Sequence, residues 1–214
     1  MKTVSLAGWA VMVCMILGTV GCSTRSRVTR TNGRDLGAYR LTVYWLSSER
    51  RFRGPKRFSL YDGKLRIARV SRRFAKSLRL QGSGRLKDGT IVQYVRRCRG
   101  RCMQVRVINR QIYPMGVGAA GVALMPLRSV AADRRFRFGT PLYIPQLGRI
   151  LRKRGQKHKG CFMVHDRGGR IRGKRLDLFT GSRRIFRRFV GRSLPRFVKV
   201  YVNHPQCSPQ VASR

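Results

Sequence analysis

Short stretches of alternating apolar and polar residues run along most of the chain, and glycine-containing turns separate them. Residues 41–45 place an apolar side chain at every second position, which is the period of a β-strand with one buried face. Residues 58–67 have a strand-like pattern on both sides of the turn Asp62-Gly63, which predicts a hairpin. Residues 197–202 again alternate apolar and polar side chains. Because short strands with frequent turns favour a barrel over a helical bundle, we expect a mostly β fold with short peripheral helices.

Two stretches carry helical periodicity instead. Ser71 is a suitable N-cap, and Phe74 and Leu78 behind it fall on one face. Ser182 is a second suitable N-cap, and apolar residues follow it at helical spacing until Gly191, which can end a helix. The sequence therefore predicts two short amphipathic helices.

The N-terminal residues 1–22 have the pattern of an export signal. One lysine precedes an apolar run, and small residues then lead to Cys22. This order resembles a lipobox, although Thr19 stands where leucine is usual, so we expect signal cleavage to leave Cys22 as a lipidated N-terminus. A plain signal peptide or a membrane anchor is the alternative. Ser23 resembles the residue of lipoproteins sent to the outer membrane, so we expect a periplasmic, lipid-anchored protein.

The rest of the chain divides into three parts. Residues 23–35 are polar, show no apolar period and predict a flexible tether. Residues 36–207 suit one well-packed domain, in a chain that is 42% apolar and 9% aromatic. Residues 208–214 form a C-terminal tail. We expect a single β-barrel domain that acts as a monomer.

Acidic residues are scarce, and their distribution indicates a site. The chain has 49 Lys and Arg against 7 Asp and Glu, and Asp133, Asp166 and Asp177 fall within 45 residues. Asp166 follows an apolar run and so falls at a strand end, while Gly168-Gly169 permits a tight turn or a close backbone approach. An extended pattern resumes around Asp177. A strand, a bend and a returning strand can bring two carboxylates onto one small surface.

Three segments of this region resemble the motifs of the three-aspartate (3D) domain. They are Arg-Ser-Val-Ala-Ala-Asp at residues 128–133, Phe-Gly-Thr-Pro-Leu-Tyr-Ile-Pro at 138–145, and Asp-x-Gly-Gly-x-Ile-x-Gly-x-x-x-Asp-x-Phe at 166–179. The 3D domain is the catalytic part of membrane-bound lytic transglycosylase A and of smaller peptidoglycan-cleaving proteins. The resemblance implies a six-stranded double-psi β-barrel that cleaves the MurNAc–GlcNAc bond without water and leaves a 1,6-anhydro end.

The resemblance also implies roles for the clustered residues. Asp177 matches the single catalytic acid of the family, Asp166 its close polar partner, and Asp133 a residue that shapes the site beside them. The acid protonates the leaving glycosidic oxygen and then, as a carboxylate, accepts the proton of the sugar's C6 hydroxyl, which attacks C1. Four further motif positions are expected to contact the substrate: Gly139, Tyr143, Gly168 and Gly169.

A carboxylic acid has to stay protonated to act in this way. Burial or a neighbouring carboxylate raises a carboxyl pKa, so Asp166 can help to keep Asp177 protonated. Basic side chains would lower that pKa if they point inward, and the sequence leaves their directions open; they are Arg167, Arg170, Arg172, Lys174 and Arg175. His165 is expected to be structural, as a histidine at a strand end usually is.

Four cysteines remain outside the signal and the lipobox. They are Cys98, Cys102, Cys161 and Cys207, and in an exported protein they predict two disulfides from three possible pairings. A zinc site that joins the first three to His158 is the alternative, but its spacing matches no familiar zinc motif. The glycine run 116–121 fits a dinucleotide fingerprint in spacing alone, because no strand–helix unit frames it. We expect no metal and no cofactor.

The net charge of +42 is the feature that the resemblance leaves unexplained. So strong a field usually indicates nucleic acid, yet the basic residues spread over the whole chain and the aromatic residues are scattered. For an exported protein, phosphorylated lipopolysaccharide, anionic headgroups and peptide-stem carboxylates are nearer polyanions, so we expect anionic envelope partners.

A second function fits the same fold. The large additional domain of membrane-bound lytic transglycosylase A is expected to have no room here, which predicts a shallower glycan groove. The residues around Asp166 are also more basic than the motif usually is. The alternative is therefore a non-catalytic lipoprotein that binds peptidoglycan or envelope polyanions.

Overall fold

The computed structural model describes residues 33–207. The predicted signal segment with Cys22 and the predicted tail at 208–214 lie outside these residues. The predicted tether, 23–35, ends slightly earlier than expected, because strand β1 already begins at Arg34. Within residues 33–207, no helix combines the length and the apolar character needed to cross a membrane.

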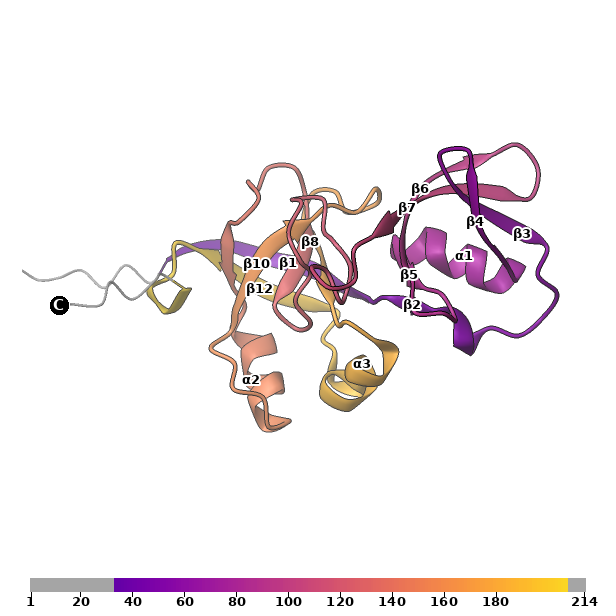
Figure 1. Ribbon diagram of the computed structural model, residues 1–214. Helices are drawn as coiled ribbons and strands as arrows, with labels where there is room; N and C mark the ends of the chain where they lie inside the picture. Colours follow the sequence, from indigo (N-terminus) through magenta and orange to yellow (C-terminus); the bar gives the residue numbers. More distant parts are fainter. Residues whose placement is uncertain (1–32, 208–214) are drawn as a thin grey trace, which may run out of the picture. The chain divides into compact units, whose positions relative to one another are not determined.

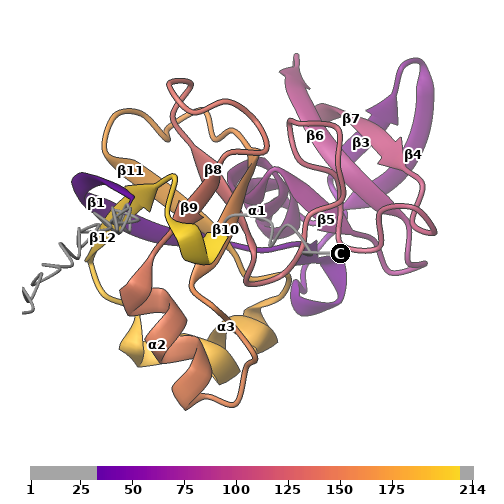
Figure 2. The ribbon, with the colours of Figure 1, turned by 90° about the vertical axis from the view of Figure 1, so that its left-hand side faces the viewer.

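The first sheet closes on itself and confirms the expected mostly β fold. Its strands pair in the ring order β1-β11-β8-β10-β9-β12, with β1 bonded to both β11 and β12 (Figures 1 and 2). The β1–β11 and β8–β10 pairs are parallel, and the others are antiparallel. The strands are β1 Arg34–Tyr44, β8 Ser129–Ala132, β9 Pro141–Tyr143, β10 Cys161–Asp166, β11 Arg175–Phe179 and β12 Phe197–Val202.

One apolar core fills this barrel. Leu41 and Leu176, from the paired strands β1 and β11, are 4% and 0% exposed and belong to the same cluster. Helix α2 (Pro145–Lys153), which the periodicity does not identify, adds Leu147 to it. Helix α3 (Arg183–Phe189) packs its apolar residues against the same cluster. Burial of alternate strand residues therefore organises the barrel, with helices covering part of its outside.

Both predicted helices form behind their predicted caps. The Ser71 hydroxyl accepts the N–H of Phe74 at 3.2 Å at the start of α1 (Arg72–Gln81). The Ser182 hydroxyl accepts the N–H of Ile185 at 3.1 Å at the start of α3. Short 3-10 turns complete the helical content of the described chain: η1 Glu49–Arg51, η2 Gly191–Ser193 and η3 Pro205–Cys207.

The chain between β1 and β8 forms a second, separate sheet of six strands in the order β2-β5-β6-β7-β3-β4. It has its own core, in which Leu60, Phe74 and Val92 are fully buried. The prediction that residues 36–207 form the barrel alone is therefore wrong, because the chain also contains this sheet. Alternation identifies a strand and its buried face but not its partner strand. The strands are β2 Ser47–Ser48, β3 Phe58–Asp62, β4 Leu65–Val70, β5 Ser83–Arg85, β6 Ile91–Cys98 and β7 Cys102–Ile108.

Two disulfides join the four cysteines that the sequence singles out. Cys98 and Cys102 close the β6–β7 hairpin, and Cys161 at the start of β10 pairs with Cys207. The zinc alternative is therefore wrong, because all its sulfur ligands are engaged in disulfides. His158, its proposed fourth ligand, is buried with both ring nitrogens hydrogen-bonded to the main chain.

Candidate active site

Two of the three clustered aspartates lie on opposite sides of strand β8, at the same level of the sheet. Asp166 on β10 and Asp177 on β11 are both cross-strand partners of Ala131. Since neighbouring strands lie about 4.8 Å apart, the two aspartate Cα atoms are separated by about 10 Å, with the small Ala131 between them. Thr42 on β1 pairs with Asp177 from the other side. The predicted strand, bend and returning strand thus bring these two carboxylates onto one surface.

A β-bulge turns Asp166 toward this surface. Phe162 and Val164 on the same strand are buried in the barrel core, and strict alternation would send Asp166 there as well. The register shifts between Val164 and Asp166, so that His165 is the extra residue. Asp166 consequently leaves the core and reaches the face that carries Asp177.

Three donors fix the carboxylate of Asp166. The Tyr44 hydroxyl donates to Oδ2 at 2.9 Å, and the main-chain N–H groups of Ala119 and Arg167 donate to Oδ1 at 2.9 and 2.8 Å. Burial raises the pKa of Asp166, while these three bonds act in the opposite direction because they stabilise the charged form. With both oxygens occupied, Asp166 is a rigid polar partner and is poorly placed to donate a proton.

Asp177 has a different environment. The residue is half-buried, and its Oδ1 is buried without a hydrogen-bond partner among residues 33–207. Burial raises the pKa of Asp177 to about 6; the Thr42 side chain opposes this, the Asp166 charge adds to it, and the Arg175 charge opposes it. Asp177 is therefore the carboxyl best suited to hold a proton near neutral pH and then release it.

The basic side chains of the motif leave Asp177 largely free of positive charge. The Arg167 guanidinium donates to the carbonyl of Phe136 and stacks on the Phe138 ring, 4.1 Å from its centroid. Arg175 lowers the pKa of Asp177, but it is the weakest of the influences named above. The three other basic residues of this segment are exposed: Arg170, Arg172 and Lys174. Burial thus outweighs the local positive charge.

Asp133 holds the loop that connects the other two aspartates. Its Oδ2 accepts the N–H of Gly173 at 2.7 Å, and its Oδ1 accepts the main-chain N–H and the guanidinium of Arg135 at 3.0 and 3.1 Å. The hydrogen bonds from the two main-chain N–H groups lower the pKa of Asp133 to about 2. A carboxylate held in this way suits a role in shaping the site and not in proton donation.

The sequence motifs and the site geometry coincide with a match to a protein family. Residues 128–202 match the family model described as 3D domain, and this range contains all three aspartates. The predicted resemblance to the 3D domain is therefore confirmed over this range. The barrel strands β8 to β12 all lie within it, whereas β1 and the second sheet precede it.

Two solved structures share the fold over more than the 3D domain. Escherichia coli MltA with bound chitohexaose matches with a TM-score of 0.54 and 17% identity, over 78% of this chain and 71% of that chain. The membrane-bound lytic murein transglycosylase of Agrobacterium tumefaciens matches with a TM-score of 0.53 and 16% identity, over 78% and 73%. At this identity the likeness establishes a common fold. Comparison with curated proteins gives no match.

The fold places two of the predicted substrate contacts beside the carboxylates. Gly168 and Gly169 lie on the loop directly after Asp166. A Cβ on Gly168 would come within 2.5 Å of the Ile171 side chain, so the close approach at this position is to the loop itself. Gly169 is exposed and has open space around it, which leaves it the freer of the two to approach a ligand.

The other two predicted substrate contacts, Gly139 and Tyr143, differ in their distance from the carboxylates. The N–H of Gly139 donates to the carbonyl of Val164 at 2.9 Å, two residues before Asp166. Tyr143 pairs with Cys161, five residues before Asp166, which places it about 16 Å along the strand. The fold thus brings Gly139 near the carboxylates and leaves Tyr143 far from them.

The histidine beside Asp166 is structural, as expected. His165 Nδ1 lies 2.9 Å from the Ser129 hydroxyl, which also accepts the N–H of Met125 at 2.9 Å. Ser129 is 0% exposed, so this serine–histidine pair is closed to a substrate. Its hydrogen bonds instead join the first residue of β8 to the bulge of β10.

Two parts of the site lie outside residues 128–202, and no sequence motif predicts them. Tyr44 projects from the face of β1 opposite to the predicted buried positions, and its sequence context carries no sign of a polar partner. In the glycine run 116–121, Gly118 packs so tightly on the His165 carbonyl that no Cβ fits, and Ala119 thereby reaches Asp166. The glycines of this run indicate close backbone approach, but only the fold shows to what.

Proposed function

We propose that this protein is a peptidoglycan lytic transglycosylase in which Asp177 is the single general acid and base. The observation that carries the proposal is the contrast between two carboxyls on one face of the barrel. Asp166 is fixed by three donors, while Asp177 lies half-buried near it, with an unpartnered buried Oδ1 and a pKa raised to about 6. One proton-holding carboxyl with one polar partner suits a reaction that needs no activated water.

The reaction balances with Asp177 alone. Its carboxylic acid gives its proton to the glycosidic oxygen as the bond from that oxygen to C1 of the MurNAc residue breaks. The resulting carboxylate accepts the proton of the C6 hydroxyl of the same sugar, whose oxygen bonds to C1. The products are a shortened strand with a 1,6-anhydro end and a released saccharide, and Asp177 is protonated again.

The supporting residues follow from the same geometry. The charge of Asp166 helps to keep Asp177 protonated, and Tyr44 and Ala119 hold Asp166 in place. We assign the ring of six strands as a double-psi barrel on the strength of the 3D domain. A glycan ligand is supported by the similar E. coli MltA structure, which was solved with bound chitohexaose.

The proposed location is the cell envelope. Export is supported by the signal-like N-terminal sequence and by two disulfides in a chain of this size. We propose that Cys22 is lipidated and anchors a monomeric protein to the outer membrane, where peptidoglycan glycan strands and anionic envelope surfaces are its partners. No proposed step uses nucleic acid, a metal or a cofactor.

The fate of water distinguishes this chemistry from hydrolysis. Purified peptidoglycan is digested in ¹⁸O-labelled water, and the released muropeptides are analysed by mass spectrometry. The proposal predicts 1,6-anhydro ends that carry no label. Reducing ends labelled with ¹⁸O would show that the protein is a hydrolase, and bound peptidoglycan without any new ends would show a binding protein.

A further inference from the structure

A strongly cationic cavity lies on the second sheet, in a part of the chain to which the proposed function assigns no role. Its volume is about 930 Å³. Eight of the fifteen residues that line it are Arg or Lys and none is acidic, whereas the whole chain has 49 Arg and Lys in 214 residues. The enrichment is more than twofold, so the basic composition of the chain does not by itself account for this cavity.

The cations come from three separate segments. Helix α1 contributes four of them, and Arg72, Lys76 and Arg79 fall on one face at helical spacing. The segment before β3 contributes Arg53 and Arg57. The β6–β7 hairpin contributes two more, which flank the disulfide that closes it. Convergence of three segments on one cavity is a property of the fold and not of a single basic run.

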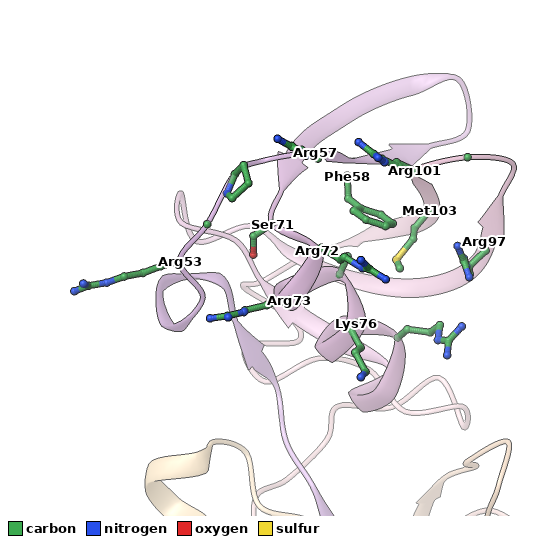
Figure 3. A pocket seen from close by; sticks show the side chains of 15 residues that line it. Arg53, Arg57, Phe58, Ser71, Arg72, Arg73, Lys76, Arg97, Arg101 and Met103 are labelled. Atoms are coloured by element: carbon green, nitrogen blue, oxygen red, sulfur yellow. The ribbon is translucent and has the colours of Figure 1, made fainter.

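The cavity has a firm apolar floor. Figure 3 shows Phe58 and Met103 between Arg57 and Arg101 on one side and Arg72 on the other. Met103 is 3% exposed and belongs to the core of the second sheet, against which Phe58 packs. The basic side chains therefore extend from a rigid base.

The eight cations have no counter-ion within the protein. Among residues 33–207 the ion pairs are Lys56 with Glu49 and Arg135 with Asp133, and none of these four residues lines the cavity. No side chain of the eight makes a hydrogen bond to another described residue, and all eight are exposed. Like charges that line one cavity repel one another, so an anion from outside would stabilise the arrangement.

We propose that this cavity binds compact ligands that carry two or more phosphate groups. Seven of the eight cations are arginines, whose planar guanidinium binds phosphate oxygens in pairs. A phosphate group carries up to about two negative charges and three acceptor oxygens, so a few of them match eight cations better than the same number of carboxylates. The ligand is either a headgroup in a bilayer or a soluble polyphosphate.

A compact ligand fits better than a nucleic-acid strand. Single strands bind by stacking successive bases on exposed aromatic side chains along a groove. Phe58 is the one aromatic residue that lines this cavity, and it lies half-buried in the floor. The proposal is independent of glycan cleavage, because none of the cavity residues belongs to the 3D domain.

The test compares two triple variants of the full chain that lose the same charge. Arg72→Gln/Lys76→Gln/Arg79→Gln removes three cavity cations from α1. Arg149→Gln/Lys153→Gln/Arg187→Gln removes two exposed arginines and one exposed lysine from α2 and α3 of the barrel. Circular dichroism and thermal melting establish that both variants fold. Digestion of peptidoglycan in parallel separates failure of this proposal from failure of the proposed enzyme activity.

Binding of inorganic tripolyphosphate is measured by calorimetry. We expect the barrel variant to bind like the parent and the α1 variant to bind about tenfold more weakly or worse, because phosphate contacts are lost. An equal loss in the two variants would show that binding follows net charge alone, and would overturn the proposal.

Two further probes identify the source of the phosphate. Phosphatidylcholine vesicles with cardiolipin are compared with vesicles of phosphatidylcholine alone. Loss of cardiolipin-dependent binding in the α1 variant supports a headgroup ligand, while retention of tripolyphosphate binding without vesicle binding supports a soluble one. If a single-stranded oligonucleotide binds the cavity more tightly than tripolyphosphate does, and this binding is lost in the α1 variant, the compact-ligand proposal is wrong.

Discussion

At the scale of single residues, the site depends on giving two aspartates opposite environments. Asp166 accepts three hydrogen bonds, whereas Asp177 has a buried oxygen without a partner and lies near the charge of Asp166. Desolvation disfavours the charged form at both positions, but three donors stabilise that form at Asp166, so the proposed mechanism assigns the transferable proton to Asp177. This division is the physical basis of the proposed mechanism.

The raised pKa of Asp177 has a consequence for stability. The folded state holds the Asp177 proton up to about pH 6, whereas the unfolded chain releases it near 3.8. The stabilising contribution of this group is therefore present below about pH 4 and is lost as the pH rises to about 6. At neutral pH the deprotonated group costs up to about 3 kcal/mol of the free energy of unfolding.

Asp177→Asn should remove this cost. We expect the variant to be more stable than the parent at about pH 8, by up to about 3 kcal/mol, and of similar stability at about pH 4. Chemical denaturation at the two pH values measures the difference. Asp133→Asn is the control with the opposite sign, since it loses hydrogen bonds that depend on its charge. An Asp177→Asn effect that is equal at both pH values would contradict the raised pKa.

Tyr44→Phe tests the link between the two aspartates. Loss of the Tyr44 hydrogen bond should raise the pKa of Asp166, so that Asp166 carries less negative charge at a given pH. Because that charge helps to keep Asp177 protonated, the pKa of Asp177 should fall. The decline of activity at high pH should then begin at a lower pH, with rates about two- to tenfold lower at neutral pH. Tyr61→Phe, in the second sheet, is the matched control. An unchanged pH profile of activity would show that Tyr44 does not contribute to catalysis.

At the scale of structural elements, the β10 bulge and the glycine loop before β8 assemble the site. The bulge selects the face on which Asp166 lies, and the loop supplies a main-chain donor to it. Neither element carries a charged motif residue. Both act through the course of the main chain, which explains why residue types alone do not reveal them.

Gly118→Ala should displace the loop without unfolding the barrel. Its new Cβ would collide with the main-chain carbonyl of His165, which cannot move aside as a flexible side chain would. We expect a loss of stability of about 1–3 kcal/mol and a larger loss of activity, because Ala119 no longer reaches Asp166. Urea denaturation and muropeptide release measure the two effects. Val122→Ala, at an exposed position of the same loop, should change neither.

The sequence predicts the features of the fold that depend on residues close together in the chain, and it misses those that depend on distant residues. Local signals are confirmed: the caps Ser71 and Ser182 start helices, and residues 58–67 form a hairpin. Long-range features are missed, because alternation does not specify which strands pair. The second sheet, the bulge at His165 and the reach of Tyr44 to Asp166 all depend on partners far apart in the chain.

At the scale of the whole molecule, we expect the net charge of +42 to govern association with anionic surfaces. Peptidoglycan carries carboxylates, and long-range attraction between exposed charges weakens as the Debye length shortens. We expect retention on purified peptidoglycan to fall steeply between low and high salt. A sedimentation assay over a salt series measures it, and salt-independent retention would show that specific contacts hold the protein instead.

In the proposed mechanism, Asp177 cleaves glycan strands without water. The decisive measurement is the yield of 1,6-anhydro-muropeptides, by mass spectrometry, from purified peptidoglycan incubated with the parent protein or with Asp177→Asn. We expect anhydro products from the parent and none above background from the variant, although the variant is folded and still binds. Equal yields from both proteins, or binding by both without any anhydro product, would contradict it.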